Sequence, residues 1–177
     1  IFFQICHGGR ACHPDMNNGY ETVSPSAIAI EGEVFTLKGI RPHVTPRALT
    51  DAEIPKYIGF FRQAAVNARE AGFDGVEVHG ANGYLIDQFL RDGSNKRQGP
   101  YGGSLANRAR FLFETLDAVI SVLGSDRVGL RLSPLNSYNS MIDSNPVGLV
   151  EFVARELNRF NLAYLHLMRS DFYGKQS

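Results

Sequence analysis

The sequence has few cysteines, no long apolar run and no excess of charge of either sign. Its 177 residues carry 18 basic and 18 acidic side chains, which gives a formal net charge of zero. A neutral chain has no overall field that would attract nucleic acid, an anionic membrane surface or a polyanionic substrate. We therefore expect no nucleic-acid partner and a small ligand that is neutral or weakly charged.

The scarcity of apolar runs and cysteines also bears on the compartment. No apolar run approaches the roughly 20 residues that are needed to span a bilayer, and residues 1–5 lack the basic flank and the length of a signal peptide. Two cysteines, Cys6 and Cys12, are too few for a disulfide scaffold. These absences predict a soluble, cytoplasmic protein in a reducing compartment, without a membrane partner.

The two ends of the chain predict that it was cut from something larger. The first residue is Ile1 rather than methionine, it stands in a run typical of a buried strand, and residues 170–177 form a polar run. The composition, with 44% hydrophobic and 20% charged residues, is that of a globular protein. We therefore expect residues 1–177 to be the central fragment of a longer domain.

Short β-rich runs and helical patterns alternate along the chain. Each β-rich run is bounded by polar or turn residues and is short enough for a buried strand. These runs predict strands at residues 1–6, 75–79, 128–132 and 163–167.

Three helical patterns separate the last three strands from one another and from the preceding loop. The first begins at the capping-box spacing of residues 50–53 and stops at Gly72. The second covers about residues 104–123, and the third opens with Asn145 as the cap and Pro146 in the first turn. Each pattern repeats apolar residues at helical spacing, which gives a face that can lie on a sheet.

The order of these elements predicts an α/β fold with a parallel sheet, since parallel neighbours need a crossover that covers the sheet face. Two architectures compete, an open doubly wound sheet and a (β/α)8 barrel. No Gly-x-Gly-x-x-Gly motif follows a strand, which weakens the first. His79 and Arg131 lie near the carboxyl ends of their strands, where barrel enzymes place their chemistry. Four strands are half of such a barrel.

A long irregular stretch, residues 13–49, separates the first strand from the first helix. Loops of this length are usually functional. We expect it to contain a small hairpin, in which residues 28–30 and 34–37 pair through a turn at residues 31–33.

His79, Asn82 and Tyr84 follow the second strand and can face one pocket. Neutral histidine and asparagine both offer N–H donors that could hold a carbonyl oxygen and stabilise negative charge on it. A tyrosine keeps its proton at neutral pH and can deliver it to a carbanion. The alternative is structural, because a histidine at a strand end often has only a packing role and Asn-Gly is a common turn dipeptide.

The residues around this turn resemble the signature of the old yellow enzyme family, which includes the oxophytodienoate reductases. The resemblance covers nearly the whole chain. It is carried by Gly72–Leu90, which contains His79-Gly80-Ala81-Asn82-Gly83-Tyr84, and by Asn95-Lys96-Arg97, Tyr101-Gly102-Gly103-Ser104, Asn107-Arg108, Arg110-Phe111, Gln4, His7-Gly8-Gly9-Arg10, Ser24-Pro25-Ser26, Val128–Pro134 and Tyr164-Leu165-His166.

The resemblance implies a fold, a cofactor and a reaction. Family members are (β/α)8 barrels that hold FMN noncovalently, and this chain would supply strands 3 to 6 of one FMN-binding domain, with the insertion at about residues 13–49. NADPH reduces the flavin, which then passes hydride to an electron-poor alkene such as an enone, an oxylipin or a quinone-like compound. By the same resemblance, the chain is part of an NADPH-dependent ene-reductase.

The resemblance also implies a role for individual residues. His79 and Asn82 would bind the carbonyl oxygen of the substrate, and Tyr84 would protonate its α-carbon. Gln4 would hydrogen-bond the pyrimidine side of FMN, and Arg131 would lie beside the ring end that becomes negative on reduction. No metal is implied.

Other residues near the predicted site have expected roles that are not chemical. Glu77, on the strand of His79, is expected to point into a polar layer of the barrel and orient its neighbours. Arg97 and Arg108 are expected to hold the loop of residues 101–103. Cys6 stands where many family members have a bulky aromatic residue, which predicts a wider floor of the site.

Two alternatives remain open. Cys6, His7, Cys12 and His13 are four potential ligands within eight residues, and they could form a zinc-binding module. Alternatively, the chain is a catalytically incomplete fragment that does not bind flavin, because the strands at the start and end of the barrel, with its usual phosphate site, lie outside it.

Overall fold

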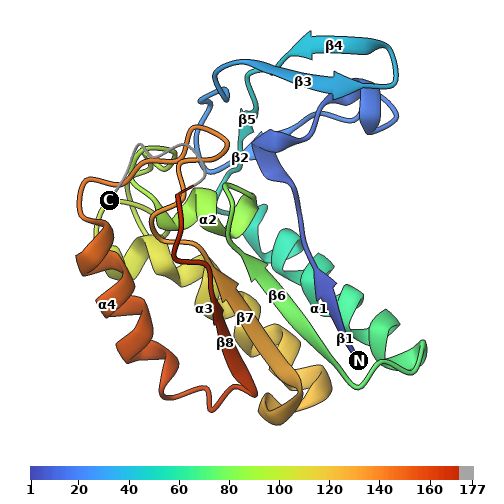
Figure 1. Ribbon diagram of the computed structural model, residues 1–177, viewed down its shortest axis with the longest axis vertical. Helices are drawn as coiled ribbons and strands as arrows, with labels where there is room; N and C mark the ends of the chain where they lie inside the picture. The colour runs from blue at the N-terminus through green and yellow to red at the C-terminus, as the bar shows by residue number, and fades with distance from the viewer. Residues whose placement is uncertain (172–177) are drawn as a thin grey trace.

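Four parallel strands form the central sheet of the computed structural model, which describes residues 1–171 and leaves most of the polar run at 170–177 outside the described part. The strands are β1 (Phe2–Ile5), β6 (Gly75–Gly80), β7 (Val128–Leu132) and β8 (Tyr164–Leu167). Their order in the sheet is β1-β6-β7-β8, and every pair is parallel (Figure 1). All four predicted strands are present, within a residue or two of the expected bounds.

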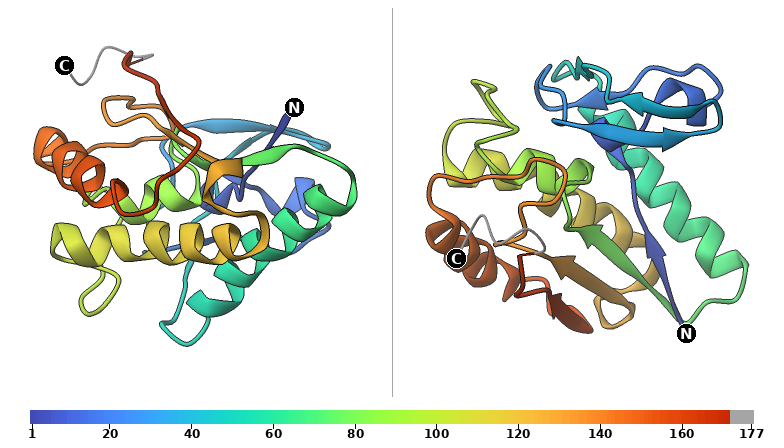
Figure 2. Two further views of the ribbon diagram at one scale, coloured as in Figure 1. Left: turned by 90° about the horizontal axis from the view of Figure 1, so that it is seen from below. Right: turned by 45° about the horizontal axis from the view of Figure 1, so that its top comes forward.

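The helices lie on one side of this sheet (Figures 1 and 2). They are α1 (Ile54–Glu70), α3 (Leu105–Leu123) and α4 (Pro146–Leu157). In a doubly wound sheet the strand order reverses and helices cover both faces, whereas here each strand is added on the same side of the one before it. Sequential order with helices on one face is the arrangement of a segment of a (β/α)8 barrel.

The two faces of the sheet differ in chemistry because side chains alternate along a strand. Val76, Val78 and Leu130 are fully buried in the core against the helices. The opposite face, which would face the barrel interior, carries polar side chains such as Glu77 and Arg131. The candidate site therefore lies on the face away from the helices.

Local sequence explains where the helices start. Ser104 caps α3, and Asn145 caps α4 as expected, because their side-chain oxygens accept backbone N–H groups. The first helix starts one turn later than predicted, at Ile54. There the Thr50 hydroxyl and backbone N–H both donate to the Glu53 carboxylate, each at 2.8 Å, so only half of the capping box forms.

The long stretch between β1 and α1 contains more structure than the sequence indicated. It holds β2 (Val23–Ser24), β3 (Glu33–Thr36), β4 (Gly39–Pro42) and β5 (Arg47–Ala48), with short 3-10 helices η1 (Gly9–Ala11) and η2 (Pro14–Met16). Further along the chain, α2 (Leu85–Leu90) and η3 (Ser125–Arg127) were also not predicted.

The predicted hairpin is present, but its predicted register is wrong. Strand β3 pairs antiparallel with β4 through a turn at Leu37-Lys38, and residues 28–30 form no strand. Gly39 has φ 96°, a left-handed conformation that favours glycine. The Thr36 hydroxyl also accepts the Lys38 N–H and donates to the Gly39 carbonyl. This turn chemistry fixes the reversal six residues later than expected.

Strand β1 differs from the buried strand that its composition predicted. Phe2, Phe3 and Gln4 are exposed and only Ile5 is buried. The reason is position, because β1 and β8 are the edge strands of the described sheet.

None of the helices in the described residues is long and apolar enough to cross a membrane.

Candidate active site

The turn from β6 to α2 brings His79, Asn82 and Tyr84 together. His79 is buried and is the last residue but one of β6, and Tyr84 is the N-cap of α2. Asn82 has φ 56° and Gly83 has φ 72°. A Cβ at Gly83 would lie 2.7 Å from the Asn139 Cβ and 2.9 Å from the Tyr138 carbonyl oxygen, so only glycine fits there.

His79 is set up as a neutral hydrogen-bond donor. Its Nδ1 accepts the Ala81 N–H at 3.3 Å, which places the proton of the neutral ring on Nε2. Burial and the nearby Arg131 cation lower the pKa of His79 below its usual 6.5. The ring lies edge-to-face against Tyr84 with centroids 5.1 Å apart. His79 therefore offers an N–H without carrying charge.

Tyr84 keeps its proton over a wide pH range. Burial raises the pKa of Tyr84 above 10, and the neighbouring Tyr138, Cys6 and Cys12 add to the effect. A phenol that stays protonated can act as a general acid.

Asn82 is held by the loop that follows β7. Its N–H donates to the Ser133 hydroxyl at 2.7 Å, and its carbonyl oxygen accepts the Asn139 amide at 2.9 Å. The Asn82 Oδ1 accepts the Asn136 amide at 3.0 Å. Because Oδ1 is occupied and Nδ2 has no partner among the described residues, the side chain offers its N–H2 group to a ligand.

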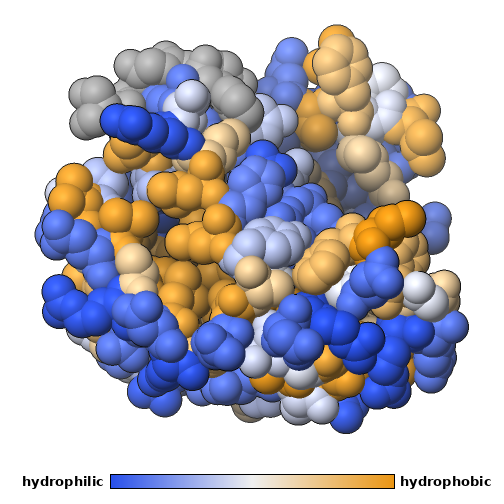
Figure 3. All heavy atoms as spheres, turned by 60° about the horizontal axis from the view of Figure 1, so that its bottom comes forward, coloured by the Kyte–Doolittle hydropathy of each residue, from blue (hydrophilic) through white to orange (hydrophobic). Residues whose placement is uncertain are grey.

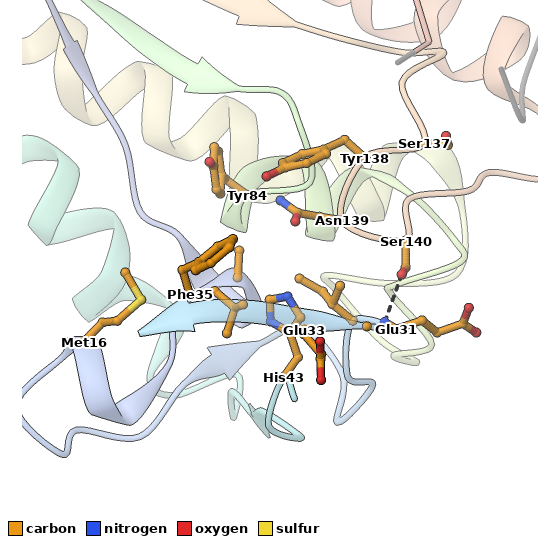
Figure 4. Close-up of a pocket in the computed structure, with 14 residues that line it drawn as sticks. Met16, Glu31, Glu33, Phe35, His43, Tyr84, Ser137, Tyr138, Asn139 and Ser140 are labelled. Atoms are coloured by element: carbon orange, nitrogen blue, oxygen red, sulfur yellow. Dashed lines mark hydrogen bonds between the residues drawn. The ribbon is translucent and has the colours of Figure 1, made fainter. Parts of the chain in front are cut away.

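Tyr84 lines a cavity of about 750 Å³ between the β7 loop and the hairpin. In Figure 4, Tyr84 and Tyr138 stand on one side of this pocket, and Phe35 and His43 stand on the other. The Ser140 hydroxyl accepts the Glu31 N–H at 3.0 Å and ties the loop to the hairpin side. The volume is within the range of small-molecule sites.

Several supporting residues were missed by the sequence analysis. The buried Gln88 amide donates to the carbonyls of Gly8 and Gly83, and its oxygen accepts the Arg10 N–H. The Asp87 carboxylate accepts the Gly83 N–H at 2.9 Å and pairs with Arg91 at 3.0 Å. Gln88 thereby joins the segment after β1 to the turn that carries Asn82 and Tyr84. Gln88 belongs to the segment Gly72–Leu90 that resembles the family signature. Its helical spacing from Tyr84, four residues earlier, was the signal that could have identified it.

The residues that could hold a cofactor lie on the same face. Arg131 pairs in register with His79, and its Nε is buried and donates no hydrogen bond to a described residue. No carboxylate in the described part forms an ion pair with it. An unpaired guanidinium fits a group that carries negative charge, as the ring of a reduced flavin does. Gln4 is exposed on β1, two strands from Arg131 and next to β6, and its amide donates to Glu77.

The four potential zinc ligands at the start of the chain do not converge. His7 accepts the Gly9 N–H at 3.0 Å, and His13 accepts the Asp15 N–H at 3.1 Å. Within residues 1–171, no three His, Cys, Asp or Glu side chains are placed to hold a metal ion. The arrangement gives no support to a zinc-binding module.

Arg97 and Arg108 both stabilise loops, but their side chains bind other segments than the loop of residues 101–103 that was predicted. Arg97 donates to the carbonyls of Pro25 and Leu49 and pairs with Asp51. Arg108 donates to the Leu90 carbonyl and pairs with Asp143, both at 2.5 Å. The partners lie far away in sequence, so motif spacing could not identify them.

The fold defines a segment of a (β/α)8 barrel, with hydrogen-bond donors at the carboxyl ends of its strands. A family model described as the NADH:flavin oxidoreductase / NADH oxidase family matches residues 1–176. The chain belongs to this family, as the resemblance to old yellow enzyme predicted.

Similar proteins support this assignment. The chain is 50% identical over 179 residues to a probable flavin mononucleotide-dependent alkene reductase of Leishmania infantum, which covers 98% of this chain and 49% of that protein. Morphinone reductase superposes with a TM-score of 0.92 at 43% identity, over 99% of this chain and 49% of the other. An old yellow enzyme homologue of Zymomonas mobilis gives 0.94 at 37% identity, over 99% and 50%. The chain thus spans about half the length of these relatives.

Proposed function

We propose that residues 1–177 are the central part of a single FMN-binding barrel domain that reduces the activated C=C bond of α,β-unsaturated carbonyl compounds. The observation that carries this proposal is the turn after β6, which presents two neutral N–H donors and one protonated phenol from His79, Asn82 and Tyr84. Enones, oxylipins and quinone-like compounds are the substrate class, and NADPH is the proposed reductant.

The relatives support each part of the proposal to a different extent. The family model and the Leishmania protein both name a flavin, which supports FMN. One structure of morphinone reductase is described as a complex with tetrahydroNAD, which supports a nicotinamide reductant without distinguishing NADH from NADPH.

Each residue of the candidate site would have its own role in the reaction. Bound FMN would supply hydride to the β-carbon of the alkene. His79 Nε2 and Asn82 Nδ2 would donate to the carbonyl oxygen and stabilise the negative charge that develops on it. The Tyr84 hydroxyl would deliver a proton to the α-carbon. Arg131 and Gln4 would hold the flavin, Arg131 through its unpaired cation.

The proton-donor role is tested by Tyr84→Phe in the FMN-loaded holoenzyme. We expect alkene reduction to slow by about 10²- to 10⁴-fold, the usual contribution of a general acid, while flavin reduction by NADPH stays within about twofold. Stopped-flow absorbance resolves the two half-reactions.

A matched control is Tyr101→Phe, because the Tyr101 hydroxyl donates to Glu114 on α3, away from the pocket. We expect neither half-reaction to change in this variant. Equal slowing of both half-reactions by Tyr84→Phe would remove Tyr84 from the proton-donor role, and a full-length protein that binds no flavin would refute the proposed function.

A further inference from the structure

Glu77 lies at the centre of a hydrogen-bonded network that crosses the whole sheet. Its carboxylate accepts the Gln4 amide on one side and faces His166 Nδ1 at 3.0 Å on the other. Gln4 comes from β1, Glu77 from β6 and His166 from β8. A single carboxylate therefore links both edge strands.

The network can span the sheet because β7 has a glycine at the intervening position. Glu77 pairs in register with Gly129, which pairs with Tyr164. A Cβ at Gly129 would lie 2.3 Å from the Tyr164 ring, so the ring occupies the space that a side chain would need. This gap lets Glu77 reach across β7 to His166.

Glu77 is an acceptor in this network. Burial raises the pKa of Glu77, but the hydrogen bonds from Gln4 and His166 outweigh burial, and the net pKa lies below the usual value. The carboxylate is therefore ionised at neutral pH, and an ionised carboxylate only accepts hydrogen bonds. The part of the Gln4 amide that faces Glu77 must then be its N–H2 group.

The orientation of Gln4 follows from this constraint. With Nε2 directed at Glu77, the Gln4 Oε1 is directed elsewhere, and no described residue donates a hydrogen bond to it. Gln4 lies on the polar face of the sheet, in register with the residue two before His79. The structure thus provides an oriented, unpartnered acceptor beside the candidate site.

We propose that Glu77 is a positioning residue that fixes the Gln4 amide, so that Gln4 presents its carbonyl oxygen to the N3–H of bound flavin. N3–H is the one N–H on the oxidised isoalloxazine ring, so an acceptor at this position selects it. This inference rests on the proposed function, because it requires that the holoenzyme binds FMN.

The test compares FMN with 3-methyl-FMN, in which a methyl group replaces the N3 hydrogen. Dissociation constants are measured on the full-length protein by quenching of flavin fluorescence, for the wild type, Gln4→Ala, Glu77→Gln and the double variant. We expect the wild type to bind 3-methyl-FMN at least about tenfold more weakly than FMN, as the loss of one buried hydrogen bond implies. A glutamine at position 77 can donate or accept, so Glu77→Gln should lose most of this discrimination.

The double variant separates positioning from a general structural effect. If Glu77 acts through Gln4, then Glu77→Gln weakens FMN binding about tenfold in the wild type and less than about twofold in the Gln4→Ala background. Equal weakening in both backgrounds, or full retention of the discrimination against 3-methyl-FMN by Glu77→Gln, would overturn the inference.

A matched control and one further outcome complete the design. Glu114→Gln also alters a carboxylate that accepts a tyrosine hydroxyl, but on the outer helix α3, and it should leave both dissociation constants unchanged. If the wild type binds FMN and Glu77→Gln behaves like Glu114→Gln, the inference fails and the proposed function stands. A full-length wild-type protein that binds no FMN overturns both.

Discussion

His79 and Tyr84 are both kept neutral within one site, His79 by a lowered pKa and Tyr84 by a raised pKa. The pKa of His79 lies below 6.5 and the pKa of Tyr84 lies above 10, in both cases mainly because burial disfavours the charged form. The site therefore holds a neutral imidazole and a neutral phenol over the whole range between these values. Both groups are in the form that donates a hydrogen bond or a proton.

This arrangement predicts a flat pH profile for alkene reduction. Between about pH 7 and 9 neither group ionises, so the single-turnover rate of the reduced holoenzyme should be constant. The rate should fall only above pH 10, where Tyr84 loses its proton. Stopped-flow measurement with an enone that has no ionisable group tests this, and a decline that begins near pH 8 would contradict it.

The sequence predicted which residues converge but not what holds them. His79, Asn82 and Tyr84 lie within six residues, so the turn alone brings them together. Gln88 contacts Gly8 and Arg10, which lie almost eighty residues earlier. Such contacts depend on how distant strands pair, and no local pattern records that pairing.

At the level of elements, side-chain caps were predictable because they act within four residues. Asn145 was recognised as a cap from the proline beside it and forms that cap, and Ser104, which was predicted only as the approximate start of the second helix, caps α3. The hairpin register was not, since Gly32 and Gly39 both have positive φ and both could have turned the chain. Leu37 and Lys38 do not have positive φ, so the reversal relies on Gly39, which directly follows them in the left-handed conformation.

The cap of α3 gives a stability prediction. Ser104→Ala removes the hydroxyl that accepts the Asn107 N–H at 3.2 Å, and the free energy of unfolding should fall by about 1 kcal/mol. Urea denaturation followed by circular dichroism measures this. Ser121→Ala is the control, because its exposed hydroxyl contacts only the Ala118 carbonyl within α3. Equal loss in both variants would mean that the cap is not the cause.

At the level of the whole molecule, the edge strands expose backbone and apolar side chains. Phe3 is 44% exposed on β1, and Leu165 and Leu167 are 45% and 49% exposed on β8. Figure 3 shows hydrophobic residues in a broad area beside the polar centre of one face. Unpaired parallel edges and apolar surface both favour association with another chain.

The 177-residue chain by itself should therefore associate and bind FMN weakly. Barrels place their phosphate site after the seventh strand, and the described residues hold four strands of the sheet. We expect the sedimentation coefficient to rise with protein concentration, and gel filtration to strip the yellow colour from the chain. A monomer that keeps one FMN per chain through the column would refute this prediction.

The pairing of β1 with β6 also has a kinetic consequence. Phe2 pairs with Gly75, whereas Gly129 pairs with Tyr164, so the first strand closes the longest loop in the sheet. Longer loops cost more entropy to close, and non-local pairing slows folding. Strand β1, the first of these four in chain order, should thus be the last of them to dock. Pulsed hydrogen exchange during refolding should protect β7 amides before those of β1.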